Sequence, residues 1–182
     1  MVYEKEQELK DHYNKYPRGG TTIANPQALR SIFDMAEINI SPHSNVLDLG
    51  CASGVMSDII RSEYDVNVTG VDSAFSRILI GREERPNIEY IEQDIHKFVR
   101  TTARKFDLII LFDTLEHLED PKTLIGYAKK LLNEKGIIIS RTPLAFPYLA
   151  HLQVFNNKAD FDLKLNPDTS IEAGRSIIAI WQ

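Results

Sequence analysis

Cysteine, basic charge and long apolar runs are scarce in this sequence. The single cysteine, Cys51, cannot form a disulfide within the chain, which is typical of proteins from a reducing cytoplasm. The net charge is −5 and no stretch is strongly basic, so unaided binding to a long nucleic acid is disfavoured, although a local basic patch stays open. No apolar run is long enough to span a bilayer, and residues 1–10 are too polar for a signal peptide. We therefore expect a cytoplasmic protein without a membrane segment.

The length and composition predict one globular domain. The chain has 182 residues, of which 43% are hydrophobic and 26% charged, which is enough apolar material for a substantial core. It contains no internal repeat, low-complexity tract or linker. We expect the domain to cover 1–182, with helices over 1–44, a central core over 45–141 and a C-terminal segment over 142–182 that ends in a hairpin.

Strand-like and helix-like segments alternate through the central core. The predicted strands are 45–49, 66–71, 88–91, 106–112 and 136–140, and the predicted helices are 3–16, 26–38, 55–64, 73–84 with Ser73 as its cap, 95–103 and 121 to about 133. After them, 161–165 and 176–181 are expected to form two antiparallel strands joined by a turn. This pattern predicts an α/β fold, a Rossmann-like doubly wound sheet of seven strands, five of them parallel and followed by an antiparallel carboxyl-terminal hairpin.

The segment 46–54, VLDLGCASG, is the main functional signal. Its apolar residues up to Leu49 predict a buried strand, and Gly50 allows a sharp turn at the strand's carboxyl end. Ala52 and Gly54 are small enough for a ligand to lie against the backbone, and the helix that follows directs free N–H groups towards it. The segment therefore predicts a nucleotide-like ligand at the first strand-to-helix turn.

Carboxylates follow the next three predicted strands. They are Asp72, Asp94 and Asp113, and open parallel sheets bind their ligands beyond these strand ends. A carboxylate at Asp72 can accept hydrogen bonds from both hydroxyls of a ribose. Simpler roles stay open, because Asp48 can cap the amides of the turn and the later acids can cap helices.

The glycine pattern and the acids together resemble the motifs of class I S-adenosylmethionine-dependent methyltransferases. The turn reads D-x-G-x-A-x-G, and the G-x-G-x-x-G spacing of a nicotinamide oxidoreductase does not fit. The resemblance is good over residues 45–141. It implies that these residues form the cofactor-binding core. It implies S-adenosylmethionine as cofactor, with its methionine end at the turn, its ribose on Asp72 and its adenine by Asp94. The implied cofactor-binding residues are Asp48, Gly50, Cys51, Ala52, Gly54, Asp72, Ser73, Asp94, Ile95 and Asp113, with Cys51 as a small filler beside the ligand.

The segment 113–121, DTLEHLEDP, resembles the fourth motif of ubiquinone-pathway O-methyltransferases. The resemblance implies that His117, with Asp113, is catalytic, because a neutral imidazole can take a hydroxyl proton as the methyl arrives. The alternative is that His117 only fixes the loop by hydrogen bonding. A further alternative comes from small-RNA 2′-O-methyltransferases, which hold a divalent ion with Glu-x-x-Glu-His and another histidine. The ligands here would be Asp113, Glu116, His117 and His151.

We therefore expect methyl transfer to a small-molecule acceptor at oxygen, with nitrogen and carbon left open. The acceptor segment, roughly 142–158, is short, so the acceptor pocket would be open and completed by a homodimer or a protein partner. Its lining residues would be Tyr13, Tyr16, Phe146, Pro147, Tyr148 and Phe155. Two alternatives are a non-catalytic methyltransferase-like domain that assists another enzyme and a metal-assisted RNA 2′-O-methyltransferase.

Overall fold

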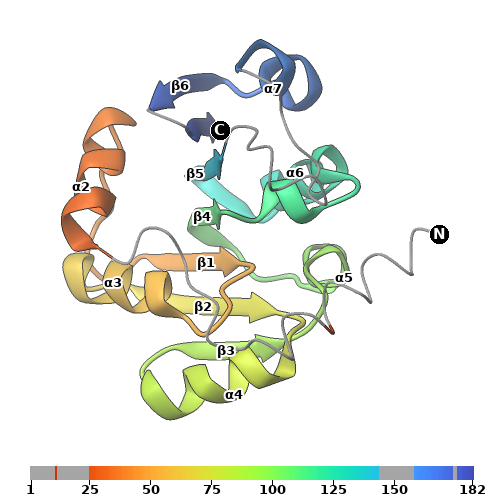
Figure 1. Cartoon of the computed structure of the whole chain (residues 1–182). Coiled ribbons are helices and arrows are strands. Elements are labelled where there is room, and N and C mark those ends of the chain that lie inside the picture. The colour runs from red at the N-terminus through yellow and green to blue at the C-terminus, as the bar shows by residue number, and fades with distance from the viewer. Residues whose placement is uncertain (1–10, 12–24, 144–157, 174–175) are drawn as a thin grey trace.

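A computed structural model describes residue 11 and residues 25–143, 158–173 and 176–182 of the chain. Its strands form one sheet of seven, in the order β3-β2-β1-β4-β5-β7-β6 (Figure 1). The strands are β1 Asn45–Leu49, β2 Asn67–Asp72, β3 Glu89–Glu92, β4 Phe106–Phe112, β5 Leu132–Pro143, β6 Thr169–Ala173 and β7 Ser176–Trp181. Strands β1 to β5 pair in parallel, and β7 runs antiparallel to both β5 and β6. The predicted fold class is therefore confirmed.

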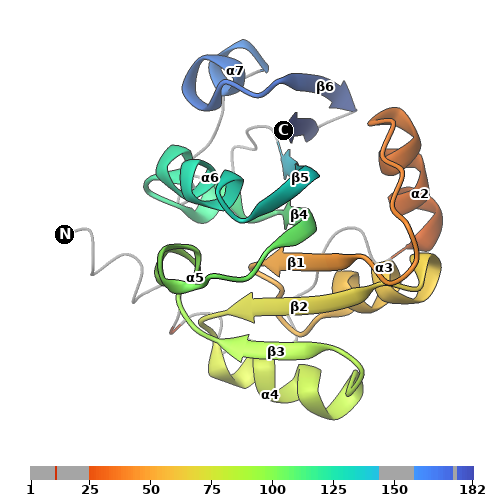
Figure 2. The same ribbon diagram turned by 180° about the vertical axis from the view of Figure 1, so that it is seen from behind.

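Helices cover both faces of the sheet, as Figures 1 and 2 show from opposite sides. They are α2 Pro26–Met35, α3 Val55–Tyr64, α4 Phe75–Glu84, α5 Ile95–Thr101, the 3₁₀ turn η1 Leu115–His117, α6 Pro121–Lys129 and α7 Lys158–Leu165. Apolar residues of α2, α3 and α4 pack in one core cluster, and those of α5, α6 and α7 pack in a second. Neighbouring residues of one strand point into different clusters, Val46 into the first and Leu47 into the second. This is the burial on two faces that the nearly continuous apolar run of β4 requires.

One predicted strand is wrong. Residues 161–165 belong to α7, and the strand that pairs with β7 is β6 instead. Phe161 and Leu165 are both buried and lie four residues apart, so they share one face of a helix. The short apolar pattern fits a strand equally well, and the packing of α7 against α6 stabilises the helical conformation.

Several element boundaries differ from the prediction by one to four residues, and two of the differences have a visible cause. Helix α6 ends at Lys129 and β5 begins at Leu132, ahead of the predicted 136, because Leu132 pairs with Phe106 before a register shift in the ladder. Ser73 does not cap α4. Ala74 occupies that position, and its N–H donates to Asp72 Oδ1 at 2.8 Å. This hydrogen bond fixes the turn that leads into α4, and among the described residues no side chain accepts from the first N–H groups of the helix itself.

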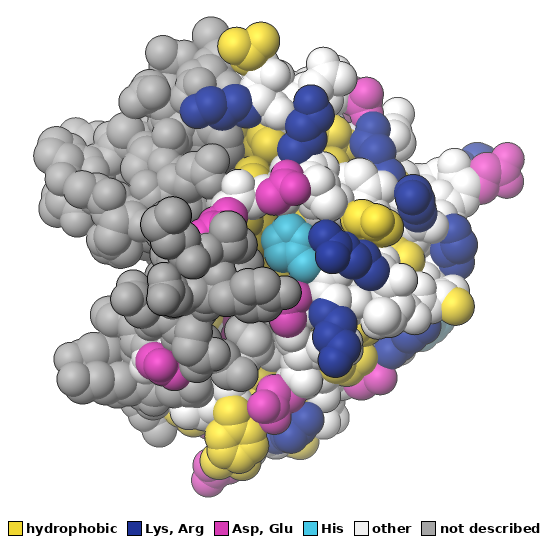
Figure 3. Space-filling view, turned by 90° about the vertical axis from the view of Figure 1, so that its right-hand side faces the viewer, with side chains coloured by type: hydrophobic (Ala, Val, Ile, Leu, Met, Phe, Trp, Pro, Cys, Tyr) yellow, Lys and Arg dark blue, Asp and Glu magenta, His cyan; other side chains and the backbone are white. Residues whose placement is uncertain are grey.

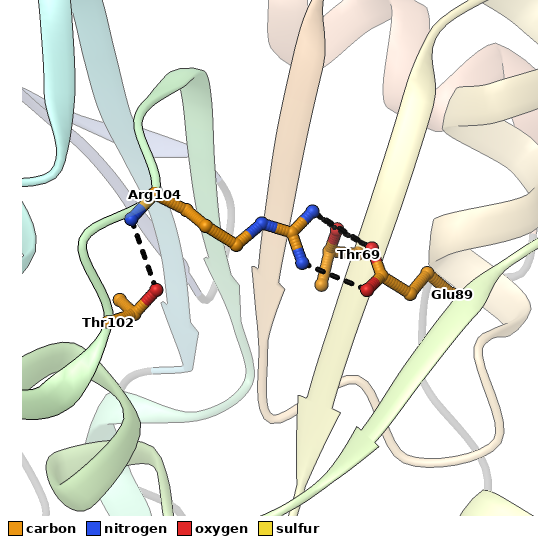
Figure 4. Close-up of polar contacts among 4 residues, drawn as sticks. All are labelled: Thr69, Glu89, Thr102 and Arg104. Atoms are coloured by element: carbon orange, nitrogen blue, oxygen red, sulfur yellow. Dashed lines mark hydrogen bonds and ion pairs between the residues drawn. The ribbon is translucent and has the colours of Figure 1, made fainter.

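Arg104 ties the loop before β4 to the sheet edge formed by β2 and β3 (Figure 4). Its Nη1 and Nη2 donate to the two carboxylate oxygens of Glu89 at 2.9 and 2.8 Å, and Nη2 also donates to Thr69 Oγ1 at 2.9 Å. The hydrogen bonds from Arg104 lower the pKa of Glu89. This pairing of a planar guanidinium with a carboxylate holds β3 in register at the rim of the sheet.

Lys and Arg side chains gather on the face of the molecule that carries α5 and α6, around one histidine (Figure 3). Arg100 and Lys130 both lie over the ring of Tyr127, at 5.2 and 4.7 Å from its centroid. They stand at the carboxyl ends of α5 and α6, where the helix dipole and the aromatic ring both favour cations. Asp and Glu side chains lie among these cations on the same face (Figure 3). In the described part of the chain, no helix combines the length and apolar character needed to cross a membrane.

Candidate functional site

The turn after β1 has an unusual backbone. Gly50, Ala52 and Gly54 have φ angles of 84°, 51° and 77°, in the left-handed region that glycine tolerates and alanine rarely adopts. Hydrogen bonds fix the turn, because the N–H groups of Gly50 and Cys51 donate to Val71 O at 2.8 and 3.2 Å. The turn is therefore fastened to the carboxyl end of the neighbouring strand β2.

Gly50 is required for a second reason. A β-carbon at this position would lie 2.7 Å from Thr114 Oγ1, a distance that real β-carbons do not show. The Thr114 hydroxyl donates to Leu49 O at 3.0 Å and so joins the end of β1 to the segment after β4. Motif reading did not single out Thr114, although it directly follows the predicted Asp113.

Asp72 lies directly against the turn. Its Oδ2 accepts the Ala52 N–H at 2.9 Å, and its Oδ1 accepts the Ala74 N–H at 2.8 Å. An ionised carboxylate offers about four lone-pair positions, so each oxygen can accept one more hydrogen bond. The two predicted parts of the donor site, the turn and the acid, are thus brought together.

Asp48 is buried beneath this site. Its carboxylate oxygen lies 2.5 Å from Ser57 Oγ, which donates to it from the first turns of α3. The pKa of Asp48 is raised to about 7, mainly by burial; the Ser57 hydrogen bond opposes this rise and the nearby Asp72 charge adds to it. Asp48 therefore joins β1 to α3, which is a supporting role different from the predicted capping of amides.

Cys51 fills space between β1 and β2. A β-carbon on Gly70 would lie 2.7 Å from its sulfur, so the thiol occupies the room that this glycine leaves. Burial raises the pKa of the thiol well above its ordinary value, and the charges of Asp48 and Asp72 act in the same direction. The side chain is thus a neutral filler, and it lacks the thiolate character of a nucleophile.

The third strand end carries Asp94, Ile95 and, before them, Gln93. Asp94 caps α5, because its Oδ1 accepts the Lys97 N–H at 2.7 Å. The Gln93 N–H donates to Asp72 O at 3.0 Å, which sets this end of β3 beside the end of β2. Ile95 is buried. The contact of Asp94 and Ile95 with adenine stays a prediction, and helix capping is a role that the structure gives to Asp94.

Asp113 pairs with Arg141 at the end of β4 and β5. The guanidinium of Arg141 donates to Asp113 Oδ1, and the Asp113 N–H donates to Arg141 O at 2.8 Å. Asp113 has a φ of 53°, so it stands at a bend of the chain. The ion pair fixes the direction of the Asp113 side chain, which favours a positioning role.

Glu116 and His117 follow in η1. Glu116 is 3% exposed, burial raises its pKa to about 8, and within the described residues its Oε2 has no hydrogen-bond partner. The His117 side chain is 24% exposed, and its Nε2 lies 4.0 Å from Glu116 Oε1. The imidazole is therefore more accessible than the glutamate beside it.

The predicted metal ligands do not combine into a site in the described residues. No three His, Cys, Asp or Glu side chains in the described ranges gather closely enough to hold an ion. Asp113 is bound to Arg141, and a glutamate with a pKa of about 8 is mostly protonated at neutral pH. As they lie in the described residues, these side chains do not form a ready cation site. His151 lies outside the described residues, as do the predicted lining residues Tyr13, Tyr16, Phe146, Pro147, Tyr148 and Phe155.

The fold and the site together define a class. Five parallel strands with β1 and β4 at the centre, an antiparallel hairpin, a glycine turn after β1 and an acid after β2 are the architecture of class I methyltransferases. Residues 23–169 match the model of a methyltransferase domain family. The chain belongs to this family, and the predicted resemblance is confirmed.

Relatives and solved structures agree with the family. The ubiquinone biosynthesis O-methyltransferase of Erwinia tasmaniensis is 29% identical to the chain, and the match covers 57% of the chain and 46% of that protein. The same enzyme of Glaesserella parasuis is 33% identical, over 56% of the chain and 48% of that protein. The chain thus spans about half the length of the curated relatives it matches. Magnesium protoporphyrin IX methyltransferase of Synechocystis with bound S-adenosylmethionine superimposes with a TM-score of 0.69 at 17% identity, over 97% of this chain and 95% of that one. The PH0226 protein of Pyrococcus horikoshii superimposes with a TM-score of 0.70 at 21% identity, over 92% of this chain and 98% of that one. These two likenesses show the fold.

Proposed function

We propose that the chain transfers a methyl group from S-adenosylmethionine to an oxygen atom of a small-molecule acceptor. The observation that carries this proposal is the hydrogen bond between Asp72 and Ala52, which joins the acid and the turn in one site. The donor's methionine end would lie at the turn and the start of α3, its ribose hydroxyls would donate to Asp72, and its adenine would lie by Asp94. The names of the curated relatives support transfer to oxygen.

When bound, S-adenosylmethionine supplies a methyl group that is already activated for displacement. The residues of this chain then need mainly to hold donor and acceptor in line, which accounts for much of the rate in such reactions. His117 takes the proton of the acceptor hydroxyl as the new bond to carbon forms. Asp113, which is held by Arg141, positions the segment after β4 that carries that imidazole.

An acceptor screen tests the proposal. Hydroxylated small molecules are incubated with the chain and S-adenosylmethionine, with and without magnesium, and S-adenosylhomocysteine and methylated product are measured by mass spectrometry. Formation of both in equal amounts supports the proposal. A chain that binds S-adenosylhomocysteine but methylates nothing would instead favour the non-catalytic partner, and a strict need for magnesium would favour the metal-assisted alternative.

The remaining expectations belong to the same proposal. They are a single domain, a cytoplasmic location, and a homodimer or partner protein that completes the acceptor side. The short segment 142–158 supports the last of these, because a short insertion leaves more of an acceptor exposed. Size-exclusion chromatography with light scattering, with and without acceptor, measures the oligomeric state.

A further inference from the structure

The carbonyl of Ser53, in the turn after β1, accepts hydrogen bonds from two side chains outside that turn. Tyr90 donates its hydroxyl at 3.2 Å from β3, and Arg85 donates Nη1 at 3.3 Å from the end of α4. Tyr90 is 8% exposed. Tyr90 thus reaches the turn from the core, whereas Arg85 is partly exposed and its Nη1 also donates to Glu84 Oε2 at 2.9 Å.

Two glycines make room for the Tyr90 ring. A β-carbon on Gly54 would lie 2.0 Å from the Tyr90 hydroxyl oxygen, and one on Gly81 would lie 2.6 Å from Tyr90 Cζ. Gly81 lies inside α4, where glycine weakens a helix and no left-handed φ requires it. The tyrosine ring is therefore the reason for this glycine, and the ring is fitted closely between α4 and the turn.

The Ser53–Gly54 peptide is held on both sides. Its carbonyl accepts from Tyr90 and Arg85, and its N–H donates to Cys51 O at 2.8 Å. Because a peptide unit is planar, bonds at both of these groups stop it from rotating. The next carbonyl, Gly54 O, accepts the Asp58 N–H at 2.9 Å and begins α3. The direction of the free N–H groups at the start of α3 is fixed in this way.

The turn needs such support, because Gly50, Ala52 and Gly54 all have positive φ angles. A left-handed alanine persists only where its surroundings hold it. We propose that Tyr90 and Arg85 are positioning residues for the methyl donor, because they hold the turn in its binding conformation before the donor arrives. This inference rests on the proposed function. A turn that is already ordered loses less conformational freedom on binding, which strengthens affinity.

Burial raises the pKa of the Tyr90 hydroxyl, so it keeps its proton and remains a donor throughout the physiological range. Tyr90→Phe then removes one hydrogen bond and leaves the ring in place. Tyr64→Phe is the matched control, because the Tyr64 ring stacks on Phe33 in α3 and α2, away from the turn. Arg85→Gln tests the second donor without altering the core.

The experiment measures S-adenosylhomocysteine affinity by calorimetry and the unfolding midpoint by heating. We expect Tyr90→Phe to weaken binding about fivefold, the loss of one hydrogen bond, and Arg85→Gln to weaken it by a similar factor. Tyr64→Phe should leave the affinity unchanged. Tyr90→Phe should lower the unfolding midpoint by only about 2–4 °C, the effect of one hydrogen bond, so that the variant is still folded when the affinity is measured. Unchanged affinity in both Tyr90→Phe and Arg85→Gln would overturn the inference. If the unmodified chain does not bind S-adenosylhomocysteine, the proposed function fails first and the inference with it.

Discussion

Asp72, the last residue of β2, accepts a hydrogen bond from the backbone N–H of Ala52 in the turn after β1, with 2.9 Å between oxygen and nitrogen. One carboxylate therefore both shapes the turn and remains able to accept hydroxyl donors. Ala52 holds a φ of 51°, and the charge-assisted bond to Asp72 helps to offset the cost of that conformation. Structure and proposed binding thus depend on the same side chain.

Replacement of this carboxylate tests its part in donor binding. Asp72→Asn removes the charge and one acceptor, so S-adenosylhomocysteine affinity should fall by about 10- to 100-fold, the loss of one or two charge-assisted hydrogen bonds. Calorimetry on the purified variant measures this change. Asp34→Asn, on the exposed side of α2, is the control and should bind like the unmodified chain. Equal affinity in Asp72→Asn would refute the ribose role.

Asp48 makes stability depend on pH in an unusual direction. Its pKa is about 7 in the folded protein and near 3.8 in the unfolded chain, so the folded state binds the extra proton between these values. The free energy of unfolding therefore decreases as pH rises from about 4 to 7. Asp48→Asn keeps an acceptor for Ser57 without the buried charge, and should be more stable than the unmodified chain at pH 8 by about 2–4 kcal/mol.

Urea unfolding of both proteins at pH 5 and pH 8 measures this effect. The gain from Asp48→Asn should be larger at pH 8 than at pH 5, because the carboxyl is already protonated at the lower pH. Asp34→Asn, at an exposed position of α2, should show no such difference. A gain of the same size at both pH values would mean that the Asp48 charge is not the cause.

Gly81 and Gly126 both lie inside helices, and replacement by alanine should change the free energy of unfolding in opposite directions at the two positions. A β-carbon at Gly81 meets the Tyr90 ring, so Gly81→Ala should lower the free energy of unfolding by about 1–3 kcal/mol. Nothing lies within 4 Å of a β-carbon at Gly126, so Gly126→Ala should raise it by about 0.5–1 kcal/mol. Urea midpoints compare the two. Similar stabilisation by both substitutions would show that the Tyr90 ring is not packed as described.

His117 should matter for the reaction and little for donor binding. With an acceptor from the screen, His117→Gln should reduce kcat by about 10²- to 10⁴-fold at neutral pH, because the proton of the acceptor hydroxyl has no base. S-adenosylhomocysteine affinity, measured by calorimetry, should change less than twofold. A variant that keeps its kcat would leave His117 with the alternative role of fixing the loop.

The sequence predicted the fold well where local pattern and packing agree. The apolar run of β4 and the glycines after Leu49 gave the sheet and the turn, because buried parallel strands and left-handed φ angles limit the residue types that fit. Residues 161–165 misled, because an apolar pair four residues apart fits a strand or a helix until the neighbour is known.

Parts of the site were beyond sequence reasoning for the same reason. Nothing in the local pattern shows that the Tyr90 hydroxyl reaches Ser53, or that Arg141 neutralises Asp113, because both contacts join strands far apart in the chain. The absence of the expected Ser73 cap, with Asp72 accepting from Ala74 in the turn before α4, is likewise not visible in the local pattern. These contacts form only when the folded sheet brings the strand ends together.

The most direct test of the account is a calorimetric titration of the unmodified chain with S-adenosylhomocysteine and, separately, with NAD under the same conditions. We expect saturable binding of S-adenosylhomocysteine with one site per chain and no measurable binding of NAD. A folded chain that binds NAD, or that shows no heat with S-adenosylhomocysteine, would contradict it.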